Sequence, residues 1–251
     1  VYQPYRANAA ALESLAYSNS GYYKEAVQYV KKTFVVNSPF TYWELRKRAG
    51  WQLLNVLDDE KTTFLGQSGK DLSALYDYIV SELERFVEAR PNDSQIYYVL
   101  PRIYRLGSEK LGKNDLQKAE ALLEQSFNYS DLRVEYYNEM ARVLLSQGKF
   151  ADGEILLKDY VNRVKSFPYF PYLFLGHYYY VAEKYDLAFE NYEKAKEADY
   201  NFCEDDGEYS RYIDAADKTK NYQEIVEMSL KFIEQKGPNA DIYFNVALGY
   251  Y

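Results

Sequence analysis

The clearest pattern in the sequence is a set of small and aromatic positions between residues 172 and 195. These positions are Tyr172, Leu175, Gly176, Tyr179, Tyr185, Ala188, Tyr192 and Ala195. Residues 172, 175 and 179 lie three and four apart, so they share one face of a helix, and residues 185 to 195 form the matching face of a second helix. We expect the two helices to cross closely at Gly176, because a bulky side chain there would overpack the crossing.

The same spacing recurs on both sides of this segment, at intervals of roughly 34 to 37 residues. An earlier copy uses Tyr137, Met140, Ala141, Leu144, Gly148, Phe150, Gly153, Leu157 and Tyr160. A later copy uses Tyr209, Tyr212, Ile213, Ala216, Tyr222, Ile225, Ser229 and Phe232, and the pattern restarts at Tyr243, Val246, Ala247 and Tyr250. Neither helix of a pair can bury its apolar stripe alone, so the pattern predicts pairs that stack on one another.

The N-terminal half follows the pattern more loosely. Residues 17–30 indicate the end of a helix, a turn at Gly21 and a second helix. Residues 40–57 and 72–89 form another predicted pair, joined by a polar loop over 58–71, and residues 96–106 and 116–127 form a third. Pro101 should bend the first helix of that third pair or mark its first turn. Alternating runs typical of strands are absent, so we expect little or no sheet.

These positions resemble the tetratricopeptide repeat, most strongly from Asp131 to Tyr251. The resemblance implies an all-α fold, a right-handed α-solenoid of stacked antiparallel helix pairs. It implies a single domain over 1–251, with pairs at 4–38, 40–90, 94–130, 134–166, 169–199 and 207–236 and a partial pair at 240–251. The sequence departs from the family at Glu183, where glycine is preferred, and at Tyr200, where proline is preferred.

The family resemblance also implies a concave ligand surface, lined by four positions on the first helix of each pair. In this chain those positions are Gln95, Tyr98, Arg102, Arg105, Glu135, Asn138, Arg142, Leu145, Phe170, Leu173, His177, Tyr180, Gly207, Ser210, Asp214, Asp217, Asp241, Phe244, Leu248 and Tyr251. The candidate ligand-binding residues among them are Tyr98, Arg102, Arg105, Asn138, Arg142, His177 and Tyr180.

Two interpretations of the three arginines stay open. As a basic strip, they would take a carboxylate or phosphate through forked guanidinium contacts. Alternatively, they pair with glutamates on adjacent helices, such as Glu135 and Glu139. The first interpretation requires Arg102, Arg142 and Tyr180 to line one continuous concave surface.

Composition fits a soluble folded protein, with 47% hydrophobic and 27% charged residues among 251. The net charge of −8 argues against a general nucleic-acid binder, which needs a basic face. No apolar run reaches the length that a membrane-spanning helix requires. Because the chain begins at Val1 and stops at Tyr251 inside a helical pattern, we expect a fragment or processed form. We also expect the open C-terminal face (Tyr243, Val246 and Tyr250) to be covered by a fold-back or by self-association.

Tyrosine is unusually frequent, with thirty copies. Most of them lie in packing positions. Others flank those positions, namely Tyr98, Tyr136, Tyr178 and Tyr180, and exposed tyrosine suits recognition because it is amphipathic and loses little entropy on binding.

The sequence offers no catalytic residues, cofactor or metal site that we would predict. His177 is the only histidine and has no Ser or Cys motif beside it. The stretch from Gly66 to Lys70 lacks the glycine and the Ser or Thr of a phosphate loop, so a flexible loop is expected there. The acidic cluster at 204–208 lacks the ligand spacing of a calcium loop and favours the N-terminus of a helix starting near Glu208. Cys203, the single cysteine, has acidic neighbours that disfavour its thiolate, which indicates an unreactive thiol.

A second resemblance involves the N-terminal segment. The runs Val1-Tyr-Gln-Pro-Tyr-Arg-Ala-Asn, Glu25-Ala26-Val27 and Trp43-Glu44-Leu45-Arg46 are similar to the start of the soluble C-terminal repeat region of bacterial O-antigen ligase or polymerase-like membrane proteins. From the repeat resemblance we predict a non-enzymatic scaffold that binds a protein or peptide through a groove lined by Tyr and Arg. A tyrosine-rich groove suits a glycan as well as a peptide. The alternative is an accessory extracytoplasmic domain of such a membrane glycosyltransferase.

Overall fold

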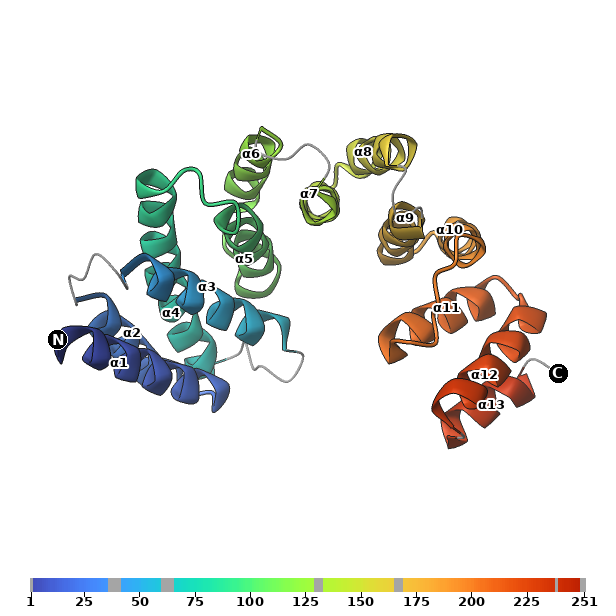
Figure 1. The fold of residues 1–251 in the computed structure, drawn as a ribbon, viewed down its shortest axis with the longest axis horizontal. Helices are drawn as coiled ribbons and strands as arrows, with labels where there is room; N and C mark the ends of the chain where they lie inside the picture. Colours follow the sequence, from blue (N-terminus) through green and yellow to red (C-terminus); the bar gives the residue numbers. More distant parts are fainter. Residues whose placement is uncertain are drawn as a thin grey trace. The chain divides into compact units, whose positions relative to one another are not determined.

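The computed structural model describes residues 2–35, 42–59, 66–128, 133–164, 169–237 and 239–248. All regular secondary structure in these ranges is helical (Figure 1), which confirms the predicted all-α fold. The helices are α1 (Tyr2–Asn19), α2 (Tyr23–Val35), α3 (Tyr42–Asp58), α4 (Gly66–Ala89), α5 (Ile96–Leu111), α6 (Leu116–Ser126), α7 (Val134–Ser146), α8 (Phe150–Arg163), α9 (Tyr169–Val181), α10 (Tyr185–Glu197), α11 (Asp206–Lys218), α12 (Tyr222–Lys236) and α13 (Ala240–Leu248).

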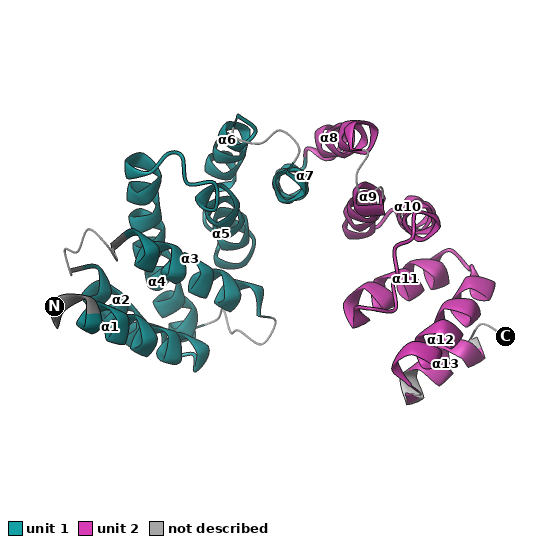
Figure 2. Ribbon diagram, in the orientation of Figure 1, with its two compact units in different colours: residues 1–148 teal, residues 149–251 magenta. Residues whose placement is uncertain are grey.

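The chain divides into two compact units (Figure 2), unit 1 over residues 1–148 and unit 2 over residues 149–251. The boundary falls in the turn between α7 and α8, so the pair expected over 134–166 contributes one helix to each unit. The single uninterrupted domain over residues 1–251 stays a prediction.

Helix pairs build most of each unit, α1–α2, α3–α4 and α5–α6 in unit 1 and α9–α10 and α11–α12 in unit 2. We call the odd-numbered helices A helices (α1, α3, α5, α7, α9, α11 and α13) and the even-numbered ones B helices (α2, α4, α6, α8, α10 and α12). In unit 1 each A helix packs on the next one, α1 on α3, α3 on α5 and α5 on α7. In unit 2 each helix from α8 to α12 packs on the next one along the chain.

Glycines mark the closest helix crossings. A Cβ atom added at Gly176 would lie 2.5 Å from the ring of Tyr192, which is fully buried. The same relation holds at Gly107 against Tyr76 and at Gly153 against the Tyr178 hydroxyl, each at 2.3 Å. The close crossing expected at Gly176 is therefore present, and a side chain at any of these sites would displace a packed ring.

Buried tyrosines tie neighbouring helices together through their hydroxyl groups. The bonds of 2.8 to 2.9 Å join Tyr76 to Asp115, Tyr104 to Glu84, Tyr136 to the Ser94 carbonyl, Tyr178 to the Phe150 carbonyl, Tyr179 to Glu154 and Tyr209 to Ser229. Each ring therefore fills the interior while its hydroxyl reaches a polar partner. Tyr136 and Tyr178, which flank the repeat positions, are also buried and belong to this set, so they offer no exposed ring for recognition.

A left-handed residue ends four of the A helices. It is Gly21, Gly148, Glu183 or Lys220, always two residues before the B helix begins, with φ between 57° and 77°. Backbone N–H groups just after this residue then bond to carbonyl groups in the last turn of the A helix. The Lys184 N–H bonds to the Tyr179 carbonyl at 2.9 Å, and the Asn221 N–H bonds to the Ala216 carbonyl at 2.8 Å. This is the hydrogen-bond pattern of a Schellman motif, in which glycine is the preferred residue.

Glu183→Gly and Lys220→Gly should therefore each raise the free energy of unfolding of unit 2 by about 1 kcal/mol, because a Cβ atom disfavours left-handed backbone. Both side chains are exposed, so little packing is lost. Urea unfolding followed by circular dichroism measures the gain. Glu183→Ala is the matched control, since it removes the same carboxylate and keeps the strain. Equal stabilities of the Gly and Ala variants would count against this explanation.

Two boundaries differ from those predicted. Helix α4 begins at Gly66, so residues 66–71 are its first turns and not part of a loop. Helix α5 continues to Leu111, so the expected turn over 107–115 is shorter. Pro101 lies in the second turn of α5 and not in the first. Its ring nitrogen cannot donate to the Tyr97 carbonyl.

Candidate functional site

The A helices of unit 1 carry a cluster of rings and charges, which we call the unit-1 patch: Trp51 and Asp58 on α3, and Tyr98 and Arg102 on α5. Trp51 is 39% exposed and its ring centroid lies 5.9 Å from that of Tyr98. Arg102 donates to the Tyr98 hydroxyl at 2.8 Å and to the Asp58 carboxylate at 2.5 Å. The patch therefore holds a half-buried guanidinium in a fixed position beside two aromatic rings.

Arg105 has a different environment from Arg102. It is buried and donates to Glu139 at 2.6 Å and to Glu109 at 2.9 Å. Burial opposes the charged form of Arg105, but the two carboxylates outweigh it and raise its pKa. The second interpretation from the sequence, pairing with a glutamate such as Glu139, thus describes Arg105. The charge of Arg105 is therefore balanced by carboxylates of the protein itself.

Two further candidates lie on α7. Asn138 and Arg142 are half-buried, and Arg142 has a partner of its own. Ser146 donates to the Arg142 carbonyl at 3.0 Å and also bonds to Glu109. These contacts place Arg142 one helical turn from the Arg105 ion pair.

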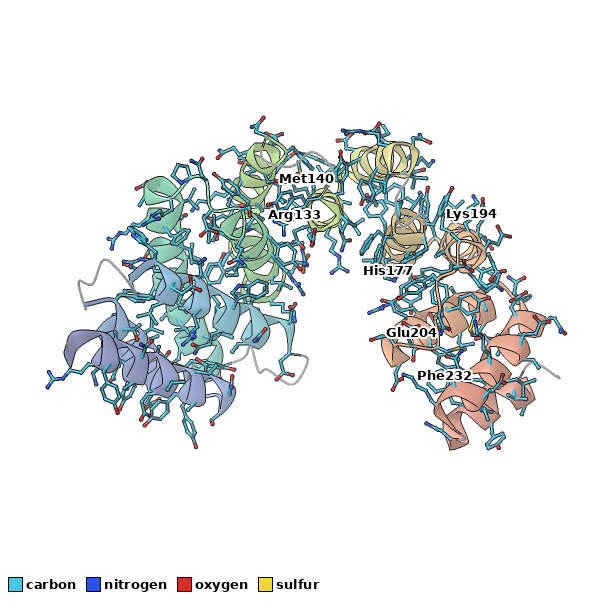
Figure 3. All side chains as sticks on the ribbon, in the orientation of Figure 1. Arg133, Met140, His177, Lys194, Glu204 and Phe232 are labelled. Atoms are coloured by element: carbon cyan, nitrogen blue, oxygen red, sulfur yellow. The ribbon has the colours of Figure 1, made fainter. Side chains whose placement is uncertain are left out.

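Unit 2 carries a second cluster, which we call the α9/α11 face: Phe170, Phe174, His177 and Tyr180 on α9, with Glu208, Arg211 and Asp214 on α11. Along α9, Phe170 stacks on Phe174, and Phe174 meets the His177 ring edge to face. Across to α11, His177 Nε2 lies 2.6 Å from Glu208 Oε2, and the Tyr180 hydroxyl donates to Asp214 at 2.8 Å. Figure 3 shows His177 on α9 and Glu204 just before α11.

The electrostatics of this face follow from its contacts. Burial disfavours the charge of Glu208, but hydrogen bonds from His177 and Arg211 outweigh it and lower the pKa of Glu208. Burial and the Asp214 carboxylate raise the pKa of Tyr180 to about 12. Glu208 is therefore ionised at neutral pH, and Tyr180 is neutral.

The seven candidate residues thus fall into two groups, five in unit 1 and His177 with Tyr180 in unit 2. A single continuous surface through Arg102, Arg142 and Tyr180 stays a prediction. One detail of the groove register was wrong. Leu173, expected to face the ligand, is buried, whereas its neighbour Phe174 is partly exposed.

Sequence reasoning missed Trp51, Asp58, Phe174, Glu208 and Arg211. A signal for Trp51 exists, because counting the repeat register from Gly50 puts Trp51 at the groove position that follows the small residue. The repeat pattern is weak around α3, however, so this register is hard to assign there. Phe174, Glu208 and Arg211 lie one residue from the expected positions, and only the packing of α9 and α11 identifies them.

Two other expectations concern the segment before α11. Asp205 caps the helix, accepting from the Glu208 N–H at 2.9 Å, so the acidic cluster does form a helix N-terminus as predicted. The Cys203 thiol is buried with its Sγ 3.5 Å from Met228 Sδ, and burial raises its pKa. Desolvation, more than the neighbouring carboxylates, keeps this thiol unreactive.

The C-terminal helix α13 packs on α12, and Tyr243 and Phe244 on it are exposed. Tyr250 lies outside the described residues, and cover by self-association stays a prediction. Among the helices described, none has the length and apolarity that a membrane crossing requires.

No family model and no curated protein matches this sequence. Among solved structures, the thermophilic TPR protein TTC0263 of Thermus thermophilus is 17% identical, with a TM-score of 0.52, covering 83% of this chain and 98% of that one. MamA is 16% identical with a TM-score of 0.46, covering 73% of this chain and 92% of that one, too low a score to bear on the fold. The likeness to TTC0263 concerns the fold alone, and it agrees with the helix pairs described above. The chain thus has an all-α fold of helix pairs similar to that of the TPR protein TTC0263.

Proposed function

We propose that the chain is a non-enzymatic interaction scaffold that binds a protein or peptide through its A-helix faces. The observation that carries the proposal is the unit-1 patch, where an exposed tryptophan adjoins Tyr98 and a guanidinium held by two hydrogen bonds. Aromatic rings and arginine dominate the energetics of protein interfaces. Fixing Arg102 in advance also reduces the entropy lost on binding.

The chemistry of the unit-1 patch favours a short segment with an apolar side chain and a hydrogen-bond acceptor. The apolar group would lie on Trp51 and Tyr98. The acceptor would meet Arg102, whose charge is already shared with Asp58. An anionic glycan would use the same guanidinium, and it serves as the competing ligand class in the test below.

Selection from a displayed random-peptide library should enrich sequences that bind the purified chain. Trp51→Ala should then weaken the enriched peptide about tenfold or more, because truncating a central aromatic anchor costs roughly 2 kcal/mol. Tyr22→Ala is the matched control, since its ring is also exposed but lies in the turn before α2. Arg142→Ala tests whether the site extends to α7.

Isothermal titration calorimetry measures each affinity. A library that yields no binder, or a binder equally affected by Trp51→Ala and Tyr22→Ala, would contradict the proposal. Binding of an anionic oligosaccharide in place of any peptide would favour the carbohydrate role that the N-terminal resemblance implies.

A further inference from the structure

Charge is distributed unevenly between the two units. Residues 149–251 contain 19 Asp and Glu against 12 Lys and Arg, a net charge of −7, whereas residues 1–148 contain 19 against 18. Nearly all of the net negative charge of the chain therefore belongs to unit 2. A field of one sign attracts a partner of the opposite sign and speeds its association.

The α9/α11 face, which Asp217 of α11 extends, places carboxylates of α11 beside the aromatic helix α9. Helix α9 contains no Asp, Glu, Lys or Arg. Helix α11 carries the acidic residues Asp206, Glu208, Asp214 and Asp217 and the basic residues Arg211 and Lys218. Arg211 is already bound to Glu208 at 2.7 Å. The face thus combines partly exposed rings with an excess of carboxylates.

Two of the α11 carboxylates, Asp214 and Asp217, form no ion pair in the described part of the chain, although Arg211 and Lys218 lie three and four residues from Asp214. Asp214 accepts a hydrogen bond from the neutral Tyr180 hydroxyl. Both aspartates are half-buried. They lie three residues apart on α11, so they are neighbours on the helix surface. Like charges at this spacing repel each other, and a cation bound between them would relieve the repulsion.

A second observation points to the same place. Tyr192 of α10 is 0% exposed, yet within the described part of the chain its hydroxyl has no hydrogen-bond partner. Its ring touches His177, and the charges that act on its hydroxyl are those of Glu208, Arg211 and Asp214. A buried hydroxyl without a partner is costly, so the interior beneath the α9/α11 face is incompletely satisfied beside Glu208 and Asp214.

We propose that the α9/α11 face binds a basic, partly apolar peptide segment of a partner protein. A lysine or arginine of that segment lies between Asp214 and Asp217, and the neighbouring apolar side chain packs on Phe174 and Tyr180. Ring faces also attract the cation directly. This inference rests on the proposed interaction function and adds the chemical class of one ligand.

The test uses the whole chain and two fluorescein-labelled peptides, Gly-Lys-Phe-Lys-Phe-Lys-Gly and its counterpart with glutamate in place of lysine. Fluorescence anisotropy should show that the lysine peptide binds and the glutamate peptide does not. The double substitution Asp214→Asn with Asp217→Asn should weaken the lysine peptide about tenfold or more, since each charge-assisted contact contributes about 1.5 kcal/mol or more.

The matched control is Glu227→Gln with Glu234→Gln on α12. Both side chains are exposed in unit 2, and the net charge changes by the same amount. The control should alter the affinity less than twofold. Circular dichroism spectra of both doubles should match that of the natural chain, so that a loss of binding is not a loss of fold.

Three results would overturn the inference: equal weakening by the two doubles, binding of the glutamate peptide, or no binding of the lysine peptide. The proposed function is tested separately, by library selection and Trp51→Ala in unit 1. A peptide that depends on Trp51, together with no lysine-peptide binding, would remove this inference and leave the proposed function standing.

Discussion

Raising the pH above about 10 should unfold the protein cooperatively, because several buried tyrosines must stay neutral in the folded state. Burial, reinforced in each case by a nearby carboxylate, raises the pKa of Tyr76, Tyr104, Tyr192 and Tyr212. The same direction holds for Tyr178, whose pKa rises to about 12. Two of the four strongly affected residues lie in each unit.

The raised pKa values determine that the free energy of unfolding falls as the pH rises. A tyrosine in the unfolded chain loses its proton near pH 10, whereas the buried one keeps it, so the unfolded state binds fewer protons above that pH. The stabilisation is complete below pH 10 and declines as the pH rises toward the folded-state pKa. Each such residue lowers the free energy of unfolding by about 1.4 kcal/mol per pH unit, so the four together remove about 5–6 kcal/mol per pH unit when the chain unfolds in one transition. Against a total stability of about 5–15 kcal/mol, unfolding is expected within roughly one to three pH units above 10.

Lysines act in the same direction. Burial opposes the charge of Lys196, but hydrogen bonds to Glu193 and Glu224 outweigh it and raise its pKa, so its contribution is also lost in alkali. Helical circular dichroism and tyrosinate absorbance, recorded together against pH, should change in one transition. Tyr104→Phe should move that transition to higher pH, and Tyr5→Phe, at an exposed position, should not. Tyrosines that all titrate near pH 10 while the helical signal persists would show that the hydroxyls are not protected by the fold.

The largest effect of a single substitution is expected at Arg46 on α3. Its side chain is 1% exposed, donates to Glu82 of α4, and lies 5.0 Å above the Phe34 ring and 5.1 Å above the Trp43 ring. Arg46→Met should lower the free energy of unfolding by about 3–5 kcal/mol, because it leaves a buried carboxylate without its main counter-charge. The second partner of Glu82, Arg85, is largely exposed.

A double-mutant cycle separates the charge from the packing. Adding Glu82→Leu to Arg46→Met should recover most of the lost stability, since two apolar side chains of similar volume then replace the ion pair. Arg48→Met, at an exposed position of the same helix, should change stability by less than about 0.5 kcal/mol. Urea unfolding provides the stabilities of the natural chain, Arg46→Met, Glu82→Leu, the double variant and the Arg48→Met control. If Arg46→Met alone lowered the free energy of unfolding by less than about 1 kcal/mol, or if the double variant recovered none of the loss, the two residues would not form a buried, coupled pair.

Much of this architecture is readable from the sequence, and the reason is periodicity. The spacing around Gly176 predicts both the pairing of α9 with α10 and their close crossing, because local repeats constrain neighbours in the chain. The Arg46–Glu82 pair is different. Its members lie 36 residues apart and belong to no motif, so only the packing of α3 on α4 brings them together. The start of α4 was missed for a related reason, because the Gly and Ser of residues 66–69 have weak helix propensity and tertiary contacts of buried Gly69 and Leu72 override it.

The candidate surfaces were partly predictable for the same reason. Tyr98, Arg102, His177 and Tyr180 follow from counting repeat positions. Their partners Asp58, Glu208 and Asp214 depend on how neighbouring pairs stack. Arg105 illustrates the limit, since position alone cannot tell a guanidinium that awaits a ligand from one that is neutralised by Glu139.

The hydroxyl ties between helices have a consequence for how such a chain can evolve. Tyrosines at the boundaries between hairpins meet different kinds of acceptor: a carboxylate at Glu84 for Tyr104 and a backbone carbonyl at Phe150 for Tyr178. Duplicating or reordering a hairpin would place a tyrosine beside a helix that lacks its acceptor. Each buried hydroxyl left without a hydrogen bond would cost about 1–3 kcal/mol. The hairpins therefore share a common shape but are not interchangeable, and their order along the chain is fixed by the chemistry at their boundaries.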